Sequence, residues 1–137
     1  MSKITPFLTF NGQAKEAMKH YTKVLPDTKT LLTVSYGETG AFDHLDDEDK
    51  TRIMQGSISI LGQNFILLDM DKAHPAPEFS WASSFLIDCQ TEEEFDLLFN
   101  AFSKEGEVLM GPDSMGPIRK CAWVTDKFGI TWQPVWK

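Results

Sequence analysis

The chain has 137 residues, which is enough for one domain or for two small halves that share a core. Hydrophobic residues make up 42 % of the chain and aromatic residues 12 %, so there is ample material for a packed interior. Acidic residues outnumber basic ones by 20 to 13, and the net charge of −7 disfavours a nucleic-acid partner.

The negative charge is concentrated in one segment. Residues 38–49 contain six acidic and no basic side chains, which leaves about −1 for the remainder of the chain (−7 + 6). The acidity is therefore a property of one loop and says little about a ligand. The segment lacks the glycine and the glutamate that an EF-hand calcium loop requires at fixed positions. We therefore expect a solvated, mobile loop.

Targeting and cysteine signals favour a cytoplasmic protein. The first ten residues, MSKITPFLTF, lack the apolar run of a signal peptide, and no run approaches the length of a membrane span. Cys89 and Cys121 lie far apart without a CxxC spacing, so we expect buried thiols and no disulfide. A membrane partner is not expected.

In the first half, a strand at Ile4–Phe10 runs directly into an amphipathic helix. We expect Asn11 to begin that helix and Pro26 to end it. Its apolar positions recur at helical spacing, namely Ala14, Ala17, Met18, Tyr21 and Val24 or Leu25. Three strands follow, predicted at Thr28–Tyr36, Arg52–Leu61 and Gln63–Asp69.

A polar stretch with two prolines, residues 71–80, is the predicted linker. The second half then repeats the order of the first, with a strand at Ser83–Cys89 and a helix. Thr91 and Glu94 form a capping-box signature at the start of this helix. Its inward face is predicted to contain Phe95, Leu98, Phe99 and Phe102. Strands are expected at Glu107–Met110, Ile118–Thr125 and Ile130–Val135, with turns across the two Gly-Pro pairs of Met110–Arg119.

The two halves match each other in sequence. A shift of 78 residues superposes Phe7–Val24 on Phe85–Phe102, and a shift of 64 superposes the closing hairpins, pairing Asp69 with Gln133. The sequence therefore predicts an α+β fold of two tandem βαβββ modules, residues 1–70 and 81–137. Because each module alone leaves one face of its sheet exposed, we expect an incomplete barrel around a cleft, with the helices outside.

This duplicated pattern resembles the vicinal oxygen chelate superfamily, which has the glyoxalase fold and includes bleomycin- and fosfomycin-resistance proteins and extradiol dioxygenases. The segments ITPFLTFNGQAKEAMKHY and DKFGITWQPV are similar to its PhnB-like branch, which carries the legacy name 3-demethylubiquinone-9 3-methyltransferase. The resemblance covers essentially the whole chain. It implies a homodimer with a small-molecule site near the interface.

The resemblance also implies where metal-dependent members hold their ion, on the first and last strands of each half. The corresponding positions in this chain are Thr5 (or Pro6), Asp69, Ser83 and Gln133. Asp69 is the one strong ligand among them, and a divalent ion needs several. His20, His44 and His74 fall on a helix, in the acidic loop and in the linker, without ligand spacing. We therefore expect neither a metal nor a cofactor.

Gln133 occupies the position of a metal-binding carboxylate but carries no charge. Its amide could orient a polar ligand group or pair with Asp69, and the alternative is that it satisfies a buried backbone group. Trp81, in phase with Ser83, and Thr131, in phase with Gln133, are further candidates for the cleft, and Arg119 is a candidate anion contact. Alternation along the strand places Trp132 on the other side, under a helix.

The sequence leaves two functional hypotheses open. The first is a metal-independent, homodimeric binding module for a small, partly apolar molecule. The second is an enzyme of the same superfamily, a lyase, isomerase or dioxygenase, with Asp69 as general base or as anchor of a weak metal. A methyltransferase is not expected, because no glycine-rich turn of a nucleotide-binding α/β unit is present.

Overall fold

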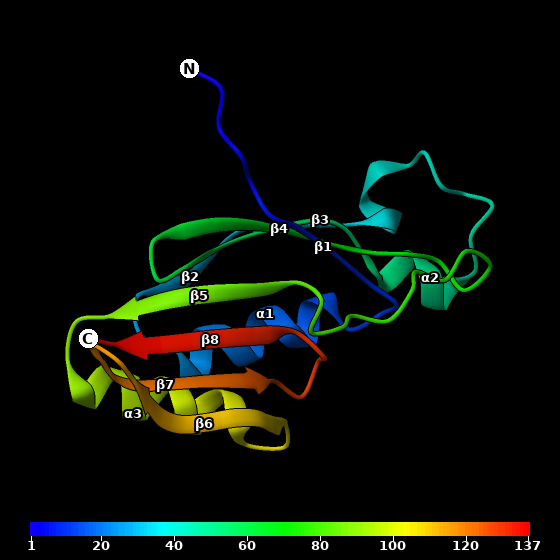
Figure 1. Ribbon diagram of the computed structural model, residues 1–137. Helices are drawn as coiled ribbons and strands as arrows, with labels where there is room; N and C mark the ends of the chain where they lie inside the picture. The colour runs from blue at the N-terminus through cyan, green and yellow to red at the C-terminus, as the bar shows by residue number, and fades with distance from the viewer. The chain divides into compact units, whose positions relative to one another are not determined.

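The computed structural model describes residues 1–137 and divides them into two compact units, Met1–Pro77 and Glu78–Lys137. Unit 1 runs from blue to green in Figure 1, and unit 2 from green to red. The boundary between them falls within residues 71–80, the segment expected to be the linker.

Unit 1 is built on one four-stranded mixed sheet. Its elements in chain order are β1 (Phe7–Phe10), α1 (Ala14–Val24), β2 (Thr28–Ser35), the 3-10 helix η1 (Tyr36–Thr39), α2 (Asp47–Thr51), β3 (Ile53–Ile60) and β4 (Gln63–Asp69). The strand order is β1-β4-β3-β2, in which β1 runs parallel to β4 and the other neighbours are antiparallel.

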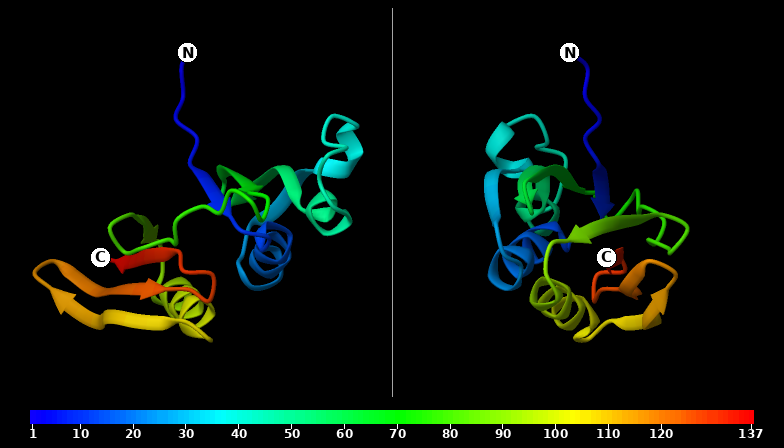
Figure 2. Two further views of the ribbon diagram at one scale, coloured as in Figure 1. Left: turned by 90° about the vertical axis from the view of Figure 1, so that its right-hand side faces the viewer. Right: turned by 60° about the vertical axis from the view of Figure 1, so that its left-hand side comes forward.

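Unit 2 has the same topology. Its elements are β5 (Ser84–Cys89), α3 (Glu92–Ser103), β6 (Glu107–Met115), β7 (Ile118–Thr125) and β8 (Thr131–Trp136). The strand order is β5-β8-β7-β6, again with one parallel pair, β5 and β8, at one edge. Two βαβββ modules in an α+β fold are thus confirmed, and neither sheet closes into a barrel. Figure 2 shows α3 lying along one face of the unit 2 sheet.

The core of each unit lies between the sheet and its long helix. In unit 1, α1 buries Ala14, Ala17, Met18 and Tyr21, which face the buried strand residues Leu8, Phe10, Ile58, Ile60, Phe65 and Leu67. In unit 2 the indole of Trp132 stacks on Phe102 of α3, with ring centroids 4.7 Å apart and planes 3° from parallel. The prediction that Trp132 packs under a helix is confirmed.

The two long helices begin differently. Thr91 Oγ1 accepts a hydrogen bond from the backbone N–H of Glu94, which confirms the predicted cap of α3. The prediction that Asn11 begins α1 is wrong, because the N-cap residue is Gln13 and its side chain makes no capping bond. The Asn11 amide instead makes two hydrogen bonds with the backbone of Ala76, of 3.0 and 2.8 Å.

The acidic segment is more ordered than expected. It contains η1 and α2, and Asp46 caps α2 by accepting a 2.8 Å hydrogen bond from the Asp49 N–H. Lys72 Nζ lies 2.7 Å from Asp46 and 3.1 Å from Glu48, which ties α2 to the chain beyond β4. The segment is folded because one lysine and the helix cap use acidic side chains that the sequence suggests are only solvated.

Residues 110–119 also differ from the expectation of turns. Strand β6 continues to Met115, and only the two residues before Ile118 form the hairpin turn. Its pairing with β7 is irregular, with register shifts on both sides of Asp113. Gly111 is required there, because a Cβ atom would lie 2.3 Å from the Cys121 carbonyl oxygen.

Cys89 and Cys121 are free thiols, and both are buried, as predicted. Burial raises the pKa of the Cys89 thiol to about 11, with a smaller contribution from the Glu94 carboxylate. None of the helices has the length and apolar character needed to cross a membrane.

Candidate functional site

Asp69 is a buried carboxylate whose two oxygens are both occupied. Oδ1 accepts hydrogen bonds from the backbone N–H groups of Gly12 (2.9 Å) and Ala14 (3.0 Å), and Oδ2 accepts one from Ile53 (2.9 Å). The side chain is 1 % exposed. Asp69 therefore supplies the N-terminal cap that α1 lacks locally, and it joins that helix to the start of β3.

Side chains around Asp69 extend this arrangement. The Tyr36 hydroxyl donates a 2.6 Å hydrogen bond to the Asp69 carbonyl oxygen, and Arg52 donates one of 2.7 Å to Met70. The pKa of Tyr36 is raised, first by burial and then by the carboxylates of Asp69, Asp71 and Asp49. Gly12 leaves room for the guanidinium of Arg52, whose atoms lie 3.1 Å from where a Cβ would stand.

Gln133 belongs to a different environment in unit 2. Because Trp132 packs against α3, its neighbour Gln133 points to the opposite face of the sheet, which we call the far face. Gln133 Nε2 donates a 2.6 Å hydrogen bond to Ser84 Oγ on the adjacent strand β5. The partner is thus a side chain and not a buried backbone group.

Four side chains, one from each strand, form a row across the far face that includes Gln133. Gln133 pairs with Leu86 of β5, and the register of β7 with β8 sets it opposite Trp123, which in turn pairs with Met110 of β6. We call Leu86, Gln133, Trp123 and Met110 the Gln133 row. Leu86 is 58 % exposed, and the Trp123 Nε1 atom is buried without a hydrogen-bond partner.

The directions in which the strand residues point show that the sequence alignment of the two halves is not their structural alignment. Asp69 points to the helix-covered side of its sheet, where it caps α1, whereas Gln133 points away from α3. The two residues are therefore not equivalent positions, and the shift of 64 is wrong by an odd number of residues. The shift of 78 fails in the same way, because Leu8 is buried and Leu86 is exposed.

The other residues proposed from the sequence lie in varied places. Thr131 is buried on the far face, and its hydroxyl is 2.9 Å from that of Thr125. Trp81 precedes β5 and packs edge-on against Trp123, with centroids 5.8 Å apart. Arg119 lies over the ring of Trp136, at 4.7 Å. Thr5 and Ser83 fall just outside strands β1 and β5, respectively.

The segment DKFGITWQ forms a tightly bonded turn. Asp126 Oδ1 accepts hydrogen bonds from the N–H groups of Phe128 (2.9 Å) and Ile130 (3.1 Å), and Oδ2 accepts one from Trp132 Nε1 (2.9 Å). Gly129 adopts a φ of 91°, which favours glycine. The aspartate, glycine and tryptophan of this segment thus stabilise the β7–β8 connection, and they leave Gln133 to face the other side.

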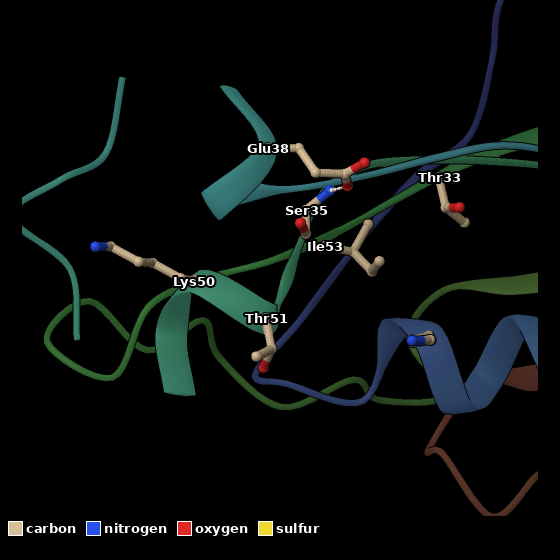
Figure 3. A pocket seen from close by; sticks show the side chains of 7 residues that line it. Thr33, Ser35, Glu38, Lys50, Thr51 and Ile53 are labelled. Atoms are coloured by element: carbon tan, nitrogen blue, oxygen red, sulfur yellow. Dashed lines mark hydrogen bonds between the residues drawn. The ribbon is translucent and has the colours of Figure 1, made fainter. Parts of the chain in front are cut away.

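Unit 1 also contains a polar groove of about 350 Å³, shown in Figure 3. Its lining residues are Lys15, Thr33, Ser35, Glu38, Lys50, Thr51 and Ile53. The Glu38 carboxylate accepts a hydrogen bond from the Ser35 N–H, and the Thr51 hydroxyl donates one to the Glu48 carbonyl. The Lys50 side chain extends away from Thr33 and Ile53. The Ser35, Glu38 and Thr51 groups thus bond within the chain, and no sequence-predicted site residue lines this groove.

The residues carried over from metal-dependent relatives do not fit a metal. Both Asp69 oxygens accept backbone hydrogen bonds. Gln133 points to the sheet face away from the helix, whereas Asp69 points to the face that a helix covers. Thr5 and Ser83 contribute hydroxyls only. In the whole chain, no group of three or more His, Cys, Asp or Glu side chains is arranged to hold an ion.

Comparison with known proteins identifies the family. The family described as 3-demethylubiquinone-9 3-methyltransferase matches residues 2–135. The chain belongs to this family. A putative 3-demethylubiquinone-9 3-methyltransferase, PhnB protein, from Bacillus cereus is 29 % identical, with a TM-score of 0.83 over 99 % of this chain and 100 % of that one. The predicted PhnB-like membership is confirmed.

More distant structures share the fold. A glyoxylase/bleomycin resistance protein/dioxygenase domain from Frankia is 15 % identical, with a TM-score of 0.67 over 99 % of this chain and 98 % of that one. The fosfomycin resistance protein FosX from Listeria monocytogenes is 11 % identical, with a TM-score of 0.60 over 100 % and 93 %. No curated protein sequence matches the chain.

Sequence reasoning misses two residues of the far face. Ser84 is the partner of Gln133, whereas the sequence pattern points to the neighbouring Ser83. Trp123 carries no signal that separates it from a packing tryptophan. Alternation along β7 places Trp123 on the face opposite Val124, but its pairing with Gln133 depends on the length of the β7–β8 turn, which the sequence does not show.

Proposed function

We propose that the chain is a small-molecule-binding protein of the PhnB-like family that works without a resident metal, and that its ligand binds the far face of the unit 2 sheet. The observation that carries this proposal is the Gln133 row. It combines a leucine, a methionine and a tryptophan with one amide that is already oriented by Ser84. Small-ligand sites are mostly apolar and contain a few placed polar groups.

Asp69 is not needed in this proposal. A general base must be reached by its substrate, and Asp69 is 1 % exposed and already accepts three backbone hydrogen bonds. In the alternative enzyme, with Asp69 as base or metal anchor, the substrate or the metal would have to reach a buried carboxylate that already binds the N–H groups of Ala14 and Ile53. We therefore favour binding, with Gln133, Trp123 and Leu86 as the contact residues, and with Thr131 in the next row of the same face.

The name of the family does not decide the activity. The B. cereus protein is described as a putative methyltransferase, but each unit of this chain is a single four-stranded mixed sheet with one long helix. This is not the doubly wound parallel sheet, with its glycine-rich turn, that usually binds nucleotide-like cofactors. FosX and the Frankia domain share the fold, and their names refer to resistance to fosfomycin and bleomycin. A homodimer and a cytoplasmic location are part of the same proposal.

A matched pair of variants tests the binding face. Leu86 lies on the far face and Leu97 on α3, and both are exposed, at 58 % and 46 %. Chelator-treated protein is titrated with naphthalene-2-carboxamide, a probe with an apolar ring and one polar amide. Binding is measured by thermal shift and calorimetry. Binding should be lost in Leu86→Lys and kept in Leu97→Lys, because only the first places a charge in the row. Equal binding by both variants would place the ligand elsewhere and contradict the proposal.

A further inference from the structure

One pair of hydrogen-bonding groups on the far face is left without partners. Trp123 Nε1 is buried and donates to no acceptor. Gln133 uses its Nε2 group on Ser84, and its carbonyl oxygen Oε1 accepts no hydrogen bond. The two residues are directly opposite each other on β7 and β8, where side chains are close neighbours. The residue with the free donor and the residue with the free acceptor are therefore cross-strand neighbours.

Trp81 packs against Trp123 and is the group that could leave. Its ring packs edge-on against Trp123 at 74°, but it is 61 % exposed and belongs to the turn before β5. A buried N–H without an acceptor is unfavourable, so replacing the Trp81 ring by a group that accepts this hydrogen bond is favoured. The ligand's own ring would restore the aromatic contact.

The free donor and the free acceptor determine which kind of ligand group fits. A carboxylate would satisfy the indole N–H but would face the Gln133 oxygen, which offers it no proton. An ammonium group would suit the Gln133 oxygen but would face the indole N–H. No ionised side chain belongs to the Gln133 row, and the Arg119 guanidinium, four residues before Trp123 on β7, is stacked on Trp136. A neutral group with an adjacent acceptor and donor matches both.

We propose that this site recognises planar, apolar-ring ligands bearing a neutral carboxamide or lactam. The ligand carbonyl accepts from Trp123 Nε1, its N–H donates to Gln133 Oε1, and its ring takes the place of Trp81. This inference rests on the proposed function, because it adds a ligand class to the same face.

Three probes with one ring system separate the possibilities: naphthalene-2-carboxamide, naphthalene-2-carboxylate and 2-naphthylmethylammonium. The full chain, labelled with ¹⁵N, is titrated with each, and the four tryptophan indole signals are followed by NMR. Trp123→Phe assigns the signal of residue 123. The carboxamide should bind about tenfold more tightly than either charged probe and move the Trp123 indole signal downfield.

Variants at Gln133 refine the test. Gln133→Leu should remove the tenfold preference for the carboxamide while the naphthalene ring still binds, and Gln133→Glu should turn the preference toward the ammonium probe. Equal binding of all three probes to the native chain, blocked by Leu86→Lys, would keep the proposed function and overturn this inference. Tightest binding of the carboxylate would also overturn it. Absence of binding by every probe would overturn both.

Discussion

The indole nitrogen of Trp132 donates a 2.9 Å hydrogen bond to Oδ2 of Asp126, six residues earlier in the chain. The same carboxylate holds the backbone of the turn between these residues through Phe128 and Ile130. One buried side chain thus fixes both the β7–β8 turn and the orientation of the tryptophan under α3. Since alternation then turns Gln133 to the far face, Asp126 indirectly positions the proposed site.

Removing the Asp126 carboxylate should strongly destabilise unit 2. Asp126→Ala leaves three donors without an acceptor, and we expect a loss of about 3 kcal/mol or more in the free energy of unfolding, measured in urea. Trp132→Phe, the matched control, removes only one of the three bonds. A double-mutant cycle should give a coupling of about 1 kcal/mol or more between the two positions. Additive effects would show that the hydrogen bond between them contributes nothing.

Asp69 should matter for stability and not for ligand binding. Asp69→Ala removes the acceptors for Gly12, Ala14 and Ile53, with an expected loss of about 3 kcal/mol in the free energy of unfolding. Asp69→Asn keeps one acceptor oxygen and should lose about half as much. In protein that remains folded at low temperature, the affinity for naphthalene-2-carboxamide should be unchanged in Asp69→Asn. A stable Asp69→Asn variant that no longer binds would assign Asp69 to the site.

The comparison of Asp69 with Gln133 shows where sequence reasoning succeeds and where it fails. Helical spacing, the Thr91 cap and the strand runs are sufficient to predict two βαβββ modules, because each is a local property. The face of the sheet to which a strand residue points cannot be predicted by aligning the sequence of one half with that of the other. A shift that is wrong by one residue moves a strand residue to the other face, and the shift depends on turns of different length. The β3–β4 turn has two residues between paired strands, whereas the β7–β8 turn has five.

Caps are predictable only when the partners are close in sequence. Thr91 and Glu94 are three residues apart, and the pattern between them is a known signal. The carboxylate that caps α1 comes from Asp69, 55 residues after Ala14. No local pattern identifies such a partner, so the sequence points to the nearest candidate, Asn11, in its place.

Tyr36 should make stability depend on pH in the alkaline range. Its pKa is raised in the folded chain, so the unfolded chain loses the phenolic proton first, near the ordinary value of 10.0. Stability should therefore fall as the pH rises from about 10 through the higher folded pKa. Tyr36→Phe should remove this part of the decrease. The measurement is urea unfolding of both chains between pH 8 and pH 11, and parallel curves would contradict the assignment.

Two glycines allow a steric effect to be separated from a conformational one. A Cβ at Gly106 would lie 2.3 Å from the Thr125 carbonyl oxygen, whereas a Cβ at Gly40 meets nothing within 4 Å but requires a φ of 71°. Gly40→Ala should cost about 1 kcal/mol through backbone strain alone. Gly106→Ala should cost several times more, because the backbone must move. Similar losses in the two variants, measured by thermal unfolding, would contradict the close packing of Gly106.

The most direct test of the central claim is the affinity of the chain for naphthalene-2-carboxamide with and without metal. Calorimetric titrations are run on protein treated with a chelator, and repeated after addition of Mn²⁺, Ni²⁺ or Zn²⁺. We predict saturable binding with the same dissociation constant in every case, weakened at least tenfold by Gln133→Leu. Binding that occurs only after a metal is added would show that the site works through an ion, and it would contradict a metal-independent binding face.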